Sequence, residues 1–295
     1  MPKTTFKELL DAGVHFGHLK RKWNPAMAPY IFMERNGIHI IDLEKTITKL
    51  DEAASAMKHM AKSGKKLLFV ATKKQAKEIV AEKVNKVNMP YVTERWPGGM
   101  LTNFPTIRKA VKKMGSIDKM ATDGTFMNLS KREKLQITRQ RAKLEKNLGS
   151  IADLTRLPSA LFVVDVCKEH IAVREAKRLG IPVFAMVDTN SDPTEIDFPI
   201  PANDDASKSI SLIVNILCQS IEEGLNERKM EKEKELQSKE KGAGRKDDKT
   251  EDIHDTADEN AEVEEDKDTV DEKTPDEKDD NENTDNSGEE SVKED

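Results

Sequence analysis

Aspartates and histidines are the residues of this 295-residue sequence best suited to chemistry. Asp188, Asp192, Asp204 and Asp205 follow apolar segments and would gather beyond the carboxyl end of the last strand, where open α/β sheets often bind ligands. A divalent cation near Asp188, Asp204 and Asp205 is one interpretation, but helix caps and loop turns explain these aspartates equally well. His15 and His18 are separated by two residues, a spacing found among metal ligands. Because no cysteine or carboxylate lies near them in sequence, we expect hydrogen-bonded structural histidines and no metal centre.

Motifs of known catalytic sites are absent from the sequence. There is no Gly-x-Gly-x-x-Gly, and Gly64-Lys65 lacks the upstream glycine of a phosphate-binding loop. No Gly-x-Ser-x-Gly elbow or paired-carboxylate motif occurs. Cys167 and Cys218 both lie among apolar residues, which predicts inert buried thiols rather than a disulfide or a zinc site. We therefore predict a protein that is not an enzyme, with no cofactor and no small-molecule substrate.

Cationic and aromatic residues instead predict contact with RNA. The adjacent cations 20–22 precede Trp23 and an Asn-Pro break, as in an irregular basic arm. A loop over 95–103 combines an arginine fork for phosphates, a tryptophan stacking face and two glycines that permit close approach. Each tryptophan could equally be an ordinary core anchor. The candidate RNA-binding residues in these two segments are Lys20, Arg21, Lys22, Trp23, Asn24, Tyr30, Arg35, Arg95, Trp96, Gly98, Gly99, Thr102 and Asn103.

A third basic segment has the pattern of two helices. Two heptad-like seams between Pro105 and Ile151 predict an antiparallel, coiled-coil-like hairpin inserted over residues 104–151. Ser130-x-x-Glu133 is a capping box for the second helix. Residues 104–148 hold 12 basic and 4 acidic side chains. A merely solvated face would mix the signs more evenly, so we predict contact with a polyanion. The candidate residues here are Arg108, Lys109, Lys112 and Lys113.

The charge is unevenly distributed along the chain. The overall net charge of −6 combines +16 over residues 1–148, −6 over 149–228 and −16 over 229–295. The last segment has no aromatic residue, and a charged chain without large apolar groups cannot offset its ordering entropy. We expect residues 229–295 to form a disordered acidic tail. Apolar runs are too short for a membrane span and the N-terminus has no apolar signal region, so we expect a cytoplasmic protein without membrane contact.

Apolar runs alternating with helical patterns predict an α/β fold. Residues 67–71, 160–164 and 181–187 have the pattern of buried parallel strands, and 90–93 that of a weaker one. Helical patterns between them predict three layers. The expected units are an N-terminal helix, basic arm and small hairpin over 1–42, an α/β domain over 43–103 and 152–228, the helical hairpin over 104–151, and the tail over 229–295.

Several motifs resemble the bacterial small-subunit ribosomal protein S two family. The resemblance spans about residues 5–226 in order, and the motifs are highly specific when taken together. The tail from about residue 229 is longer and more acidic than the family pattern requires. The motifs include Gly13-Val-His-Phe-Gly-His18, Trp23-Asn-Pro25, Gly37-Ile-His-Ile-Ile-Asp-Leu43, Arg95-Trp-Pro-Gly-Gly99, Leu101-Thr-Asn-Phe104, Pro158-Ser-Ala-Leu-Phe-Val-Val-Asp165 and Ile200-Pro-Ala-Asn-Asp-Asp-Ala206.

The resemblance implies a flavodoxin-like parallel sheet with an inserted coiled-coil hairpin. It also implies a structural constituent of the small ribosomal subunit, which contacts small-subunit ribosomal RNA between head and body and lies beside other small-subunit proteins. A further implication is support for the docking of ribosomal protein S one in translation. Two alternatives are an α/β enzyme that uses the Asp188–Asp205 rim and a purely protein-binding scaffold. Turnover of a phosphoester would favour the first, and binding that is insensitive to salt and RNA the second.

Overall fold

The computed structural model describes residues 4–124, 126 and 129–243. Three apolar segments, β4 (Leu67–Val70), β6 (Ala160–Val164) and β7 (Val183–Val187), are buried along their whole length. With β5 (Tyr91–Val92) and β8 (Phe198–Pro201) they form a parallel sheet in the order β5-β4-β6-β7-β8. Continuous apolar strands are typical of parallel sheets covered on both faces. The predicted α/β class is confirmed.

The sequence analysis missed strand β8. Its sequence, Phe-Pro-Ile-Pro, contains two prolines that cannot donate to a strand ladder. Proline is tolerated on an edge strand, and β8 pairs only with β7 at the edge of the sheet. The position in the sheet therefore permits a strand that the local sequence disfavours.

Alternate side chains of the central strands point to two separate apolar layers. On one side, which we call the α7 face, Phe69, Phe162 and Phe184 pack under helices α2 (Leu43–Lys62), α3 (Lys74–Lys86) and α7 (Ser207–Ala243). On the other side, the α6 face, the layer is completed by helix α6, a loop and the base of a helical hairpin. This layer includes Leu68, Val70, Leu161, Val163, Trp96, Met100, Leu101, Leu148, Ala172, Val173 and Ala176. Helix α6 spans His170–Arg178.

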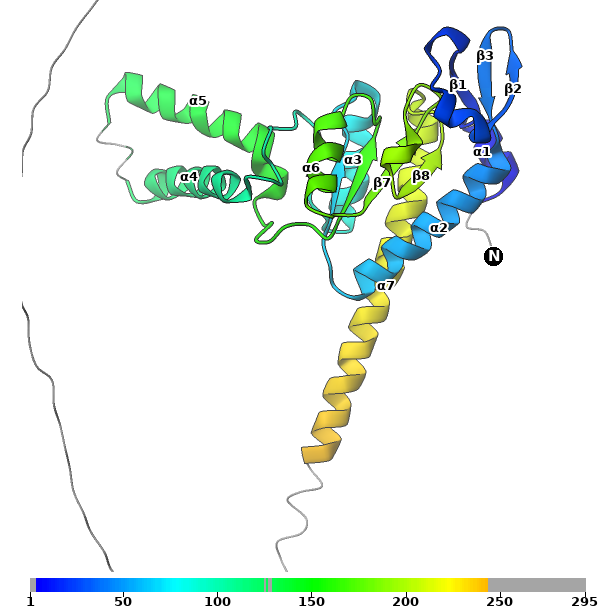
Figure 1. Ribbon diagram of the computed structural model, residues 1–295. Coiled ribbons are helices and arrows are strands. Elements are labelled where there is room, and N and C mark those ends of the chain that lie inside the picture. The colour runs from blue at the N-terminus through cyan, green and yellow to red at the C-terminus, as the bar shows by residue number, and fades with distance from the viewer. Residues whose placement is uncertain (1–3, 125, 127–128, 244–295) are drawn as a thin grey trace, which may run out of the picture. The chain divides into compact units, whose positions relative to one another are not determined.

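The N-terminal part forms a small antiparallel sheet in the order β1-β3-β2 (Figure 1). It contains β1 (Phe16–Leu19), β2 (Ile31–Arg35) and β3 (Ile38–Ile41), preceded by helix α1 (Phe6–Asp11). The β2–β3 turn has positive φ at Asn36 (54°) and Gly37 (75°), as a tight hairpin turn requires. The small hairpin expected at these residues is confirmed. The basic arm between β1 and β2 forms two 3-10 helices, η1 (Lys20–Lys22) and η2 (Pro25–Tyr30).

Helices α4 (Phe104–Thr122) and α5 (Lys131–Leu148) lie side by side within the segment expected to form a hairpin (Figure 1). The capping box at Ser130 and Glu133 is present. Arg141 lies in the heptad-like seam of α5, among apolar seam residues such as Leu144 and Leu148, and forms ion pairs with Asp118 of α4 and with Glu145. That pairing explains how the seam accepts a cation. Coiled-coil packing of the two helices stays a prediction.

Two sequence expectations need correction. Helix α7 continues to Ala243, past the boundary at 228 that we expected for the folded part. The part of α7 after residue 228 is so rich in charged residues that its composition is like that of the expected tail. Glu231 in this part nevertheless pairs with Lys62 of α2 at 2.6 Å. Residues 244–295 of the expected tail lie outside the described residues. Cys218 is buried as expected, and burial raises the pKa of its thiol to about 12, but Cys167 is exposed.

Within the part of the chain that the structure describes, no helix is long and apolar enough to cross a membrane.

Candidate nucleic-acid interface

The basic arm is fixed to the α/β sheet just beyond the carboxyl end of β7. The Asn24 backbone N–H donates to the Thr189 carbonyl at 2.8 Å, and Asn24 Oδ1 accepts from the Ala26 N–H and so caps η2. Met27 is fully buried in the α6-face layer, and Tyr30 packs against it. The arm therefore has local order although its sequence has no helix or strand period.

The cations of the arm differ in their surroundings. Lys20 pairs with Glu34 at 2.7 Å, whereas Arg21 and Lys22 are exposed and have no ion pair among the described residues. Trp23 is 37% exposed, with its ring 5.2 Å from that of His39. Arg35 is exposed at the end of β2. One indole face and at least two free cations are thus available on this segment.

A single carboxylate organises the loop over 95–103. Glu175 of α6, only 8% exposed, accepts five hydrogen bonds from this loop. The donors are Trp96 Nε1 (3.1 Å), Gly99 N (2.8 Å), Leu101 N (2.9 Å), Thr102 N (3.1 Å) and Thr102 Oγ1 (3.2 Å). Burial acts to raise the pKa of Glu175, but these hydrogen bonds to its charged form outweigh it and hold the pKa below the ordinary value.

Because of Glu175, several residues that the sequence analysis proposed for RNA binding in that loop have a structural role instead. Trp96 is 7% exposed and packs in the core, so in this conformation it offers no stacking face to a base. Gly99 has φ of 82°, a conformation that favours glycine, and its N–H points to Glu175. Asn103 precedes α4 and its Oδ1 accepts from the Thr106 hydroxyl. Arg95 and Gly98 are exposed, which leaves this arginine as the free cation of the loop.

The cations of α4 fall into two groups. Lys109, Lys112 and Lys113 are exposed, and the described residues offer them no acidic partner. Arg108 is half-buried, and its Nη1 donates to the Leu154 carbonyl at 2.9 Å, which ties the base of the hairpin to the chain after α5. Three lysines crowded on two turns of helix repel one another unless they face an anion.

All three basic segments meet the same side of the sheet. Met27 of the arm, Trp96 and Leu101 of the loop, and Ile107 and Leu148 of the hairpin belong to the α6-face layer or pack against it. Apolar residues of three segments that are far apart in sequence therefore pack against one face of the sheet. We call the exposed cations of these segments the basic surface: Arg21, Lys22, Arg95, Lys109, Lys112 and Lys113.

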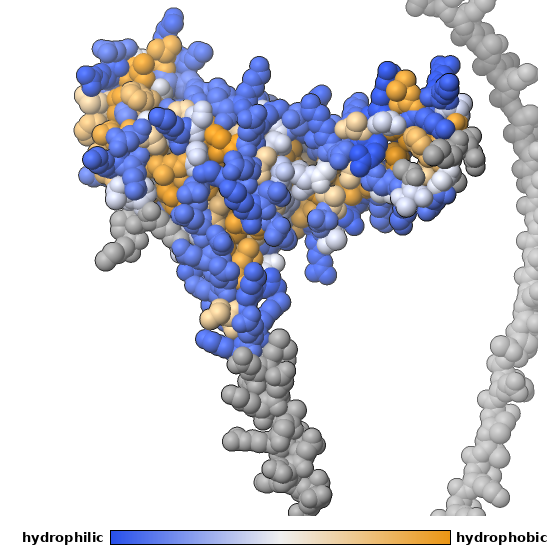
Figure 2. All heavy atoms as spheres, turned by 180° about the vertical axis from the view of Figure 1, so that it is seen from behind, coloured by the Kyte–Doolittle hydropathy of each residue, from blue (hydrophilic) through white to orange (hydrophobic). Residues whose placement is uncertain are grey.

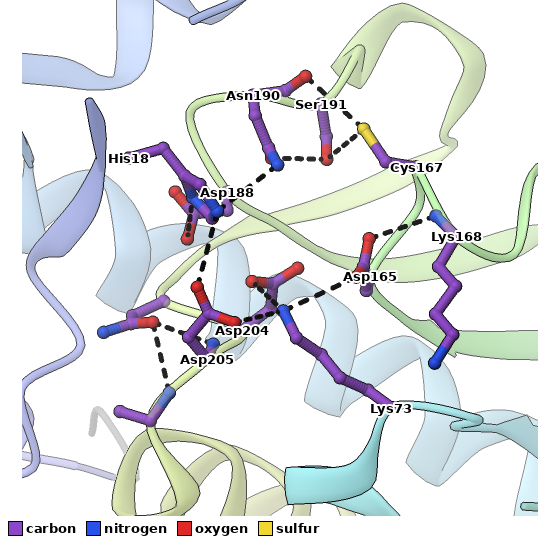
Figure 3. A network of polar contacts seen from close by, with 12 residues as sticks. His18, Lys73, Asp165, Cys167, Lys168, Asp188, Asn190, Ser191, Asp204 and Asp205 are labelled. Atoms are coloured by element: carbon purple, nitrogen blue, oxygen red, sulfur yellow. Dashed lines mark hydrogen bonds and ion pairs between the residues drawn. The ribbon is translucent and has the colours of Figure 1, made fainter. Parts of the chain in front are cut away.

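A separate polar network lies at the carboxyl edge of the sheet (Figure 3). Lys73 Nζ lies 2.8 Å from Asp204 Oδ1, 2.6 Å from Asp205 Oδ1 and 3.4 Å from Asp165 Oδ2. His18 contacts Asp188 Oδ2 through Nδ1 at 3.0 Å and Asp205 Oδ2 through Nε2 at 3.4 Å. Asp192, in contrast, caps the short helix η5 (Pro193–Glu195), as the loop-turn interpretation expected.

Burial shapes the protonation of this network. Burial, reinforced by the charges of Asp188 and Asp165, raises the pKa of Asp204 to about 7. The hydrogen bond with Asp188 raises the pKa of His18 above its usual range. His18, Asp188 and Asp204 each offer one ligand atom, all within 4.8 Å of one another. One nitrogen and two carboxylate oxygens are ligands of the kind that a divalent ion such as zinc takes, so these three residues fit the cation interpretation as well as the ion pairs described above.

An apolar groove crosses the small N-terminal sheet. It has a volume of about 730 Å³, and His15 and the turn after β2 contribute to its wall. Phe6, Phe16, Phe32 and Met33 line it and are each about half exposed or more. Hydrophobic residues gather at this end of the molecule in Figure 2. Exposed apolar patches of this kind usually mark interaction sites.

Comparison with known proteins gives the chain its family. Residues 9–224 match the family described as Ribosomal protein S2. The chain is 74% identical over 249 residues to the small ribosomal subunit protein uS2 of Phocaeicola vulgatus, covering 83% of this chain and 89% of that protein. It is 78% identical over 232 residues to the uS2 of Porphyromonas gingivalis, covering 79% and 83% of the two chains. The chain belongs to the ribosomal protein S2 family.

Membership in the S2 family shows that the protein is structural and not an enzyme. Proteins of this family are structural, non-enzymatic components of the small ribosomal subunit, which is cytoplasmic in bacteria. The family therefore associates with small-subunit ribosomal RNA and with other ribosomal proteins, in translation. The sequence analysis predicted this class correctly. It overlooked Glu175, whose position among the buried Ala172, Val173 and Ala176 was the available signal: an acid on the apolar side of a helix needs partners.

Proposed function

We propose that the chain binds small-subunit ribosomal RNA between head and body through its basic surface. The observation that supports this most strongly is the trio Lys109, Lys112 and Lys113, exposed on α4 without acidic partners. Arg95 and the arm cations Arg21 and Lys22 are exposed on two further segments that pack against the α6-face layer. Cations that neutralise phosphates release bound counterions, so affinity should fall steeply as salt is raised.

The test is a titration of ribosomal RNA at several salt concentrations. Lys109→Gln/Lys112→Gln/Lys113→Gln removes the trio and leaves Arg108, which ties the hairpin base to Leu154, in place. Three lost phosphate contacts should lower the salt slope by roughly 2 log units per log unit of salt. The control is Lys49→Gln/Lys86→Gln on α2 and α3, where each lysine pairs with a neighbouring glutamate. A slope that the triple variant leaves unchanged would mean that the trio is only a solvated surface.

We further propose that the apolar groove supports docking of ribosomal protein S one. The groove is lined by exposed phenylalanines, and its rim has one cation, Arg35, and two acids, Asp42 and Glu44. An aromatic or aliphatic segment of a partner would bury this surface and gain hydrophobic free energy.

Phe16→Ser/Phe32→Ser tests the groove. Binding of purified ribosomal protein S one should weaken about 10-fold or more, since burying one phenylalanine stabilises an interface by about 1.5–3 kcal/mol. Binding to ribosomal RNA should stay unchanged, because the groove is separate from the trio on α4. Unchanged affinity for ribosomal protein S one would rule the groove out as its docking site.

A further inference from the structure

The outward side of α6 is cationic because both acids of its segment turn inward. Glu169, just before the helix, is 4% exposed and accepts from the Thr72 N–H and hydroxyl. Glu175 is 8% exposed and is used by the loop over 95–103. Both negative charges of residues 168–178 are thus removed from the surface of the segment.

The remaining charges of the helix are arginines and lysines. Arg174 and Arg178 are exposed, lie one turn apart on the same side of α6, and have no ion pair or side-chain hydrogen bond among the described residues. Lys177, beside them, is 3.9 Å from Glu195, at the limit of an ion pair. Lys168 Nζ donates to the Thr72 carbonyl at 2.9 Å and so lies at the sheet edge.

Helix α6 packs against the loop that presents Arg95 of the basic surface. Its inner residues Ala172, Val173 and Ala176 share the α6-face layer with Trp96 and Leu101 of the loop. The Glu175 carboxylate joins α6 to that loop directly, beside the exposed Arg95. Among the covering helices of the α7 face, Lys49 pairs with Glu52 and Lys86 with Glu82, whereas Lys74 and Lys208 are exposed and have no ion pair among the described residues. Arg95, Arg174 and Arg178 are exposed on the α6 face and have no ion pair among the described residues.

We propose that the outward side of α6, centred on Arg174 and Arg178, binds the phosphate backbone of ribosomal RNA. This inference rests on the proposed binding of ribosomal RNA and adds a contact region to it. The planar guanidinium fork matches two phosphate oxygens, and two forks one helical turn apart reach neighbouring phosphates. An acidic protein is the competing partner for such a surface, and the experiment separates the two.

The experiment compares Arg174→Gln/Arg178→Gln with the wild-type full chain in titrations of ribosomal RNA at several salt concentrations. Loss of two phosphate contacts should lower the salt slope by about 1.4–1.8 log units and weaken binding on the order of 10-fold at moderate salt. The control Lys49→Gln/Lys86→Gln removes equal charge from the α7 face and should lower the slope by much less. Arg174→Lys/Arg178→Lys retains the charges and should keep most of the slope. Each single glutamine variant should lower the salt slope by about half as much as the double variant. The single variants therefore still test the proposal if the double variant does not fold.

The outcomes distinguish this inference from the proposed function. A wild-type slope in the double variant, with a lower slope in the Lys109/Lys112/Lys113 variant, overturns the role of α6 and leaves the hairpin as the RNA-binding element. An equal loss in the control and double variants overturns it as well, because the effect would then follow net charge alone. Failure of the wild-type chain to bind ribosomal RNA with salt dependence overturns both proposals.

Discussion

At the scale of single residues, Glu175 has the most consequences. Its carboxylate accepts hydrogen bonds from the Trp96 indole, from three backbone N–H groups and from a hydroxyl, so one side chain fixes the whole 95–103 loop. A buried charge is tolerated only where such donors replace water. The conformation that presents Arg95 at the surface therefore depends on a residue that itself faces inward.

Replacing Glu175 with glutamine should destabilise the protein by about 2–4 kcal/mol. Glutamine has the same size but lacks the charge and one acceptor, so buried N–H donors of the loop lose their partner. Urea unfolding measures the loss. Glu78→Gln, at an exposed position of α3, is the control and should change stability by less than about 0.5 kcal/mol. Equal stabilities of the two variants would show that the loop keeps its shape without the carboxylate.

The raised pKa of Asp204 predicts that stability depends on pH. Its folded pKa of about 7 lies above the ordinary value of 3.8, so the folded state holds more protons between these pH values. Stability should therefore fall as pH rises from 5 to 7, by at most about 1.4 kcal/mol per pH unit for one group. The raised pKa of His18 acts in the same direction above pH 6.5.

Asp204→Asn isolates this contribution, because asparagine keeps the Oδ1 acceptor for Lys73 but cannot ionise. Urea midpoints between pH 5 and 7.5, measured on chelator-treated protein, should decline less in the variant than in the wild type. Parallel profiles would contradict the assignment. Metal analysis of untreated protein reports separately whether His18, Asp188 and Asp204 hold a divalent ion.

At the scale of elements, the close approach of α2 and α7 depends on a glycine. A Cβ added at Gly224 of α7 would lie 2.4 Å from the Lys58 carbonyl of α2. The helices are then joined on the outside by Lys58 with Glu227 (2.7 Å) and Lys62 with Glu231 (2.6 Å). These exposed pairs add little free energy, so the apolar packing beneath them supplies most of the stability of this contact.

Gly224→Ala should destabilise the protein by about 1–3 kcal/mol, because the methyl group pushes the two helices apart. Gly115→Ala on α4 is the matched control, since nothing lies within 4 Å of the added Cβ. There the better helix propensity of alanine should stabilise the hairpin by up to about 1 kcal/mol. Opposite signs in urea or thermal unfolding are expected. A stabilising effect at both positions would show that α7 can shift without cost.

At the scale of the whole molecule, charge should separate RNA binding from the C-terminal segment. Residues 247–295 hold 24 acidic and 5 basic side chains, and this segment lies outside the described residues. RNA repels such a segment, so removing residues 244–295 should leave binding to ribosomal RNA equal or tighter, and more so at low salt. The cut follows Ala243, where α7 ends, rather than the earlier boundary at 228.

A titration of the full-length and truncated chains at two salt concentrations measures this effect. A third chain, with an uncharged Gly/Ser segment of equal length after Ala243, separates charge from chain length. It should behave like the truncated form if charge is the cause. Binding that is several-fold weaker at both salts in the truncated chain would mean that the segment contributes to RNA binding.

The fold class, the small N-terminal hairpin and the family could all be predicted from the order of the amino acids. Buried strands such as β6 could be predicted from a run of five apolar residues bounded by polar turns, between segments with a helical pattern. The tight turn at Asn36 and Gly37 follows from backbone sterics alone. Asp192 as a cap is likewise a local property. Each of these depends on neighbours in sequence.

Which side chains remain exposed to a binding partner depends on packing between distant parts of the chain. Trp96 and Trp23 have similar sequence surroundings, yet one is buried over Glu175 and the other is exposed beside His39. Strand β8 forms despite its prolines because an edge position needs fewer donors. The meeting of Lys73 with aspartates from the ends of β6 and β8, and the inward turn of the acids of α6, depend on contacts between residues about 70 to 130 positions apart. The local sequence pattern does not contain such contacts. Packing between distant segments decides which side chains are buried, and therefore which charges remain at the surface.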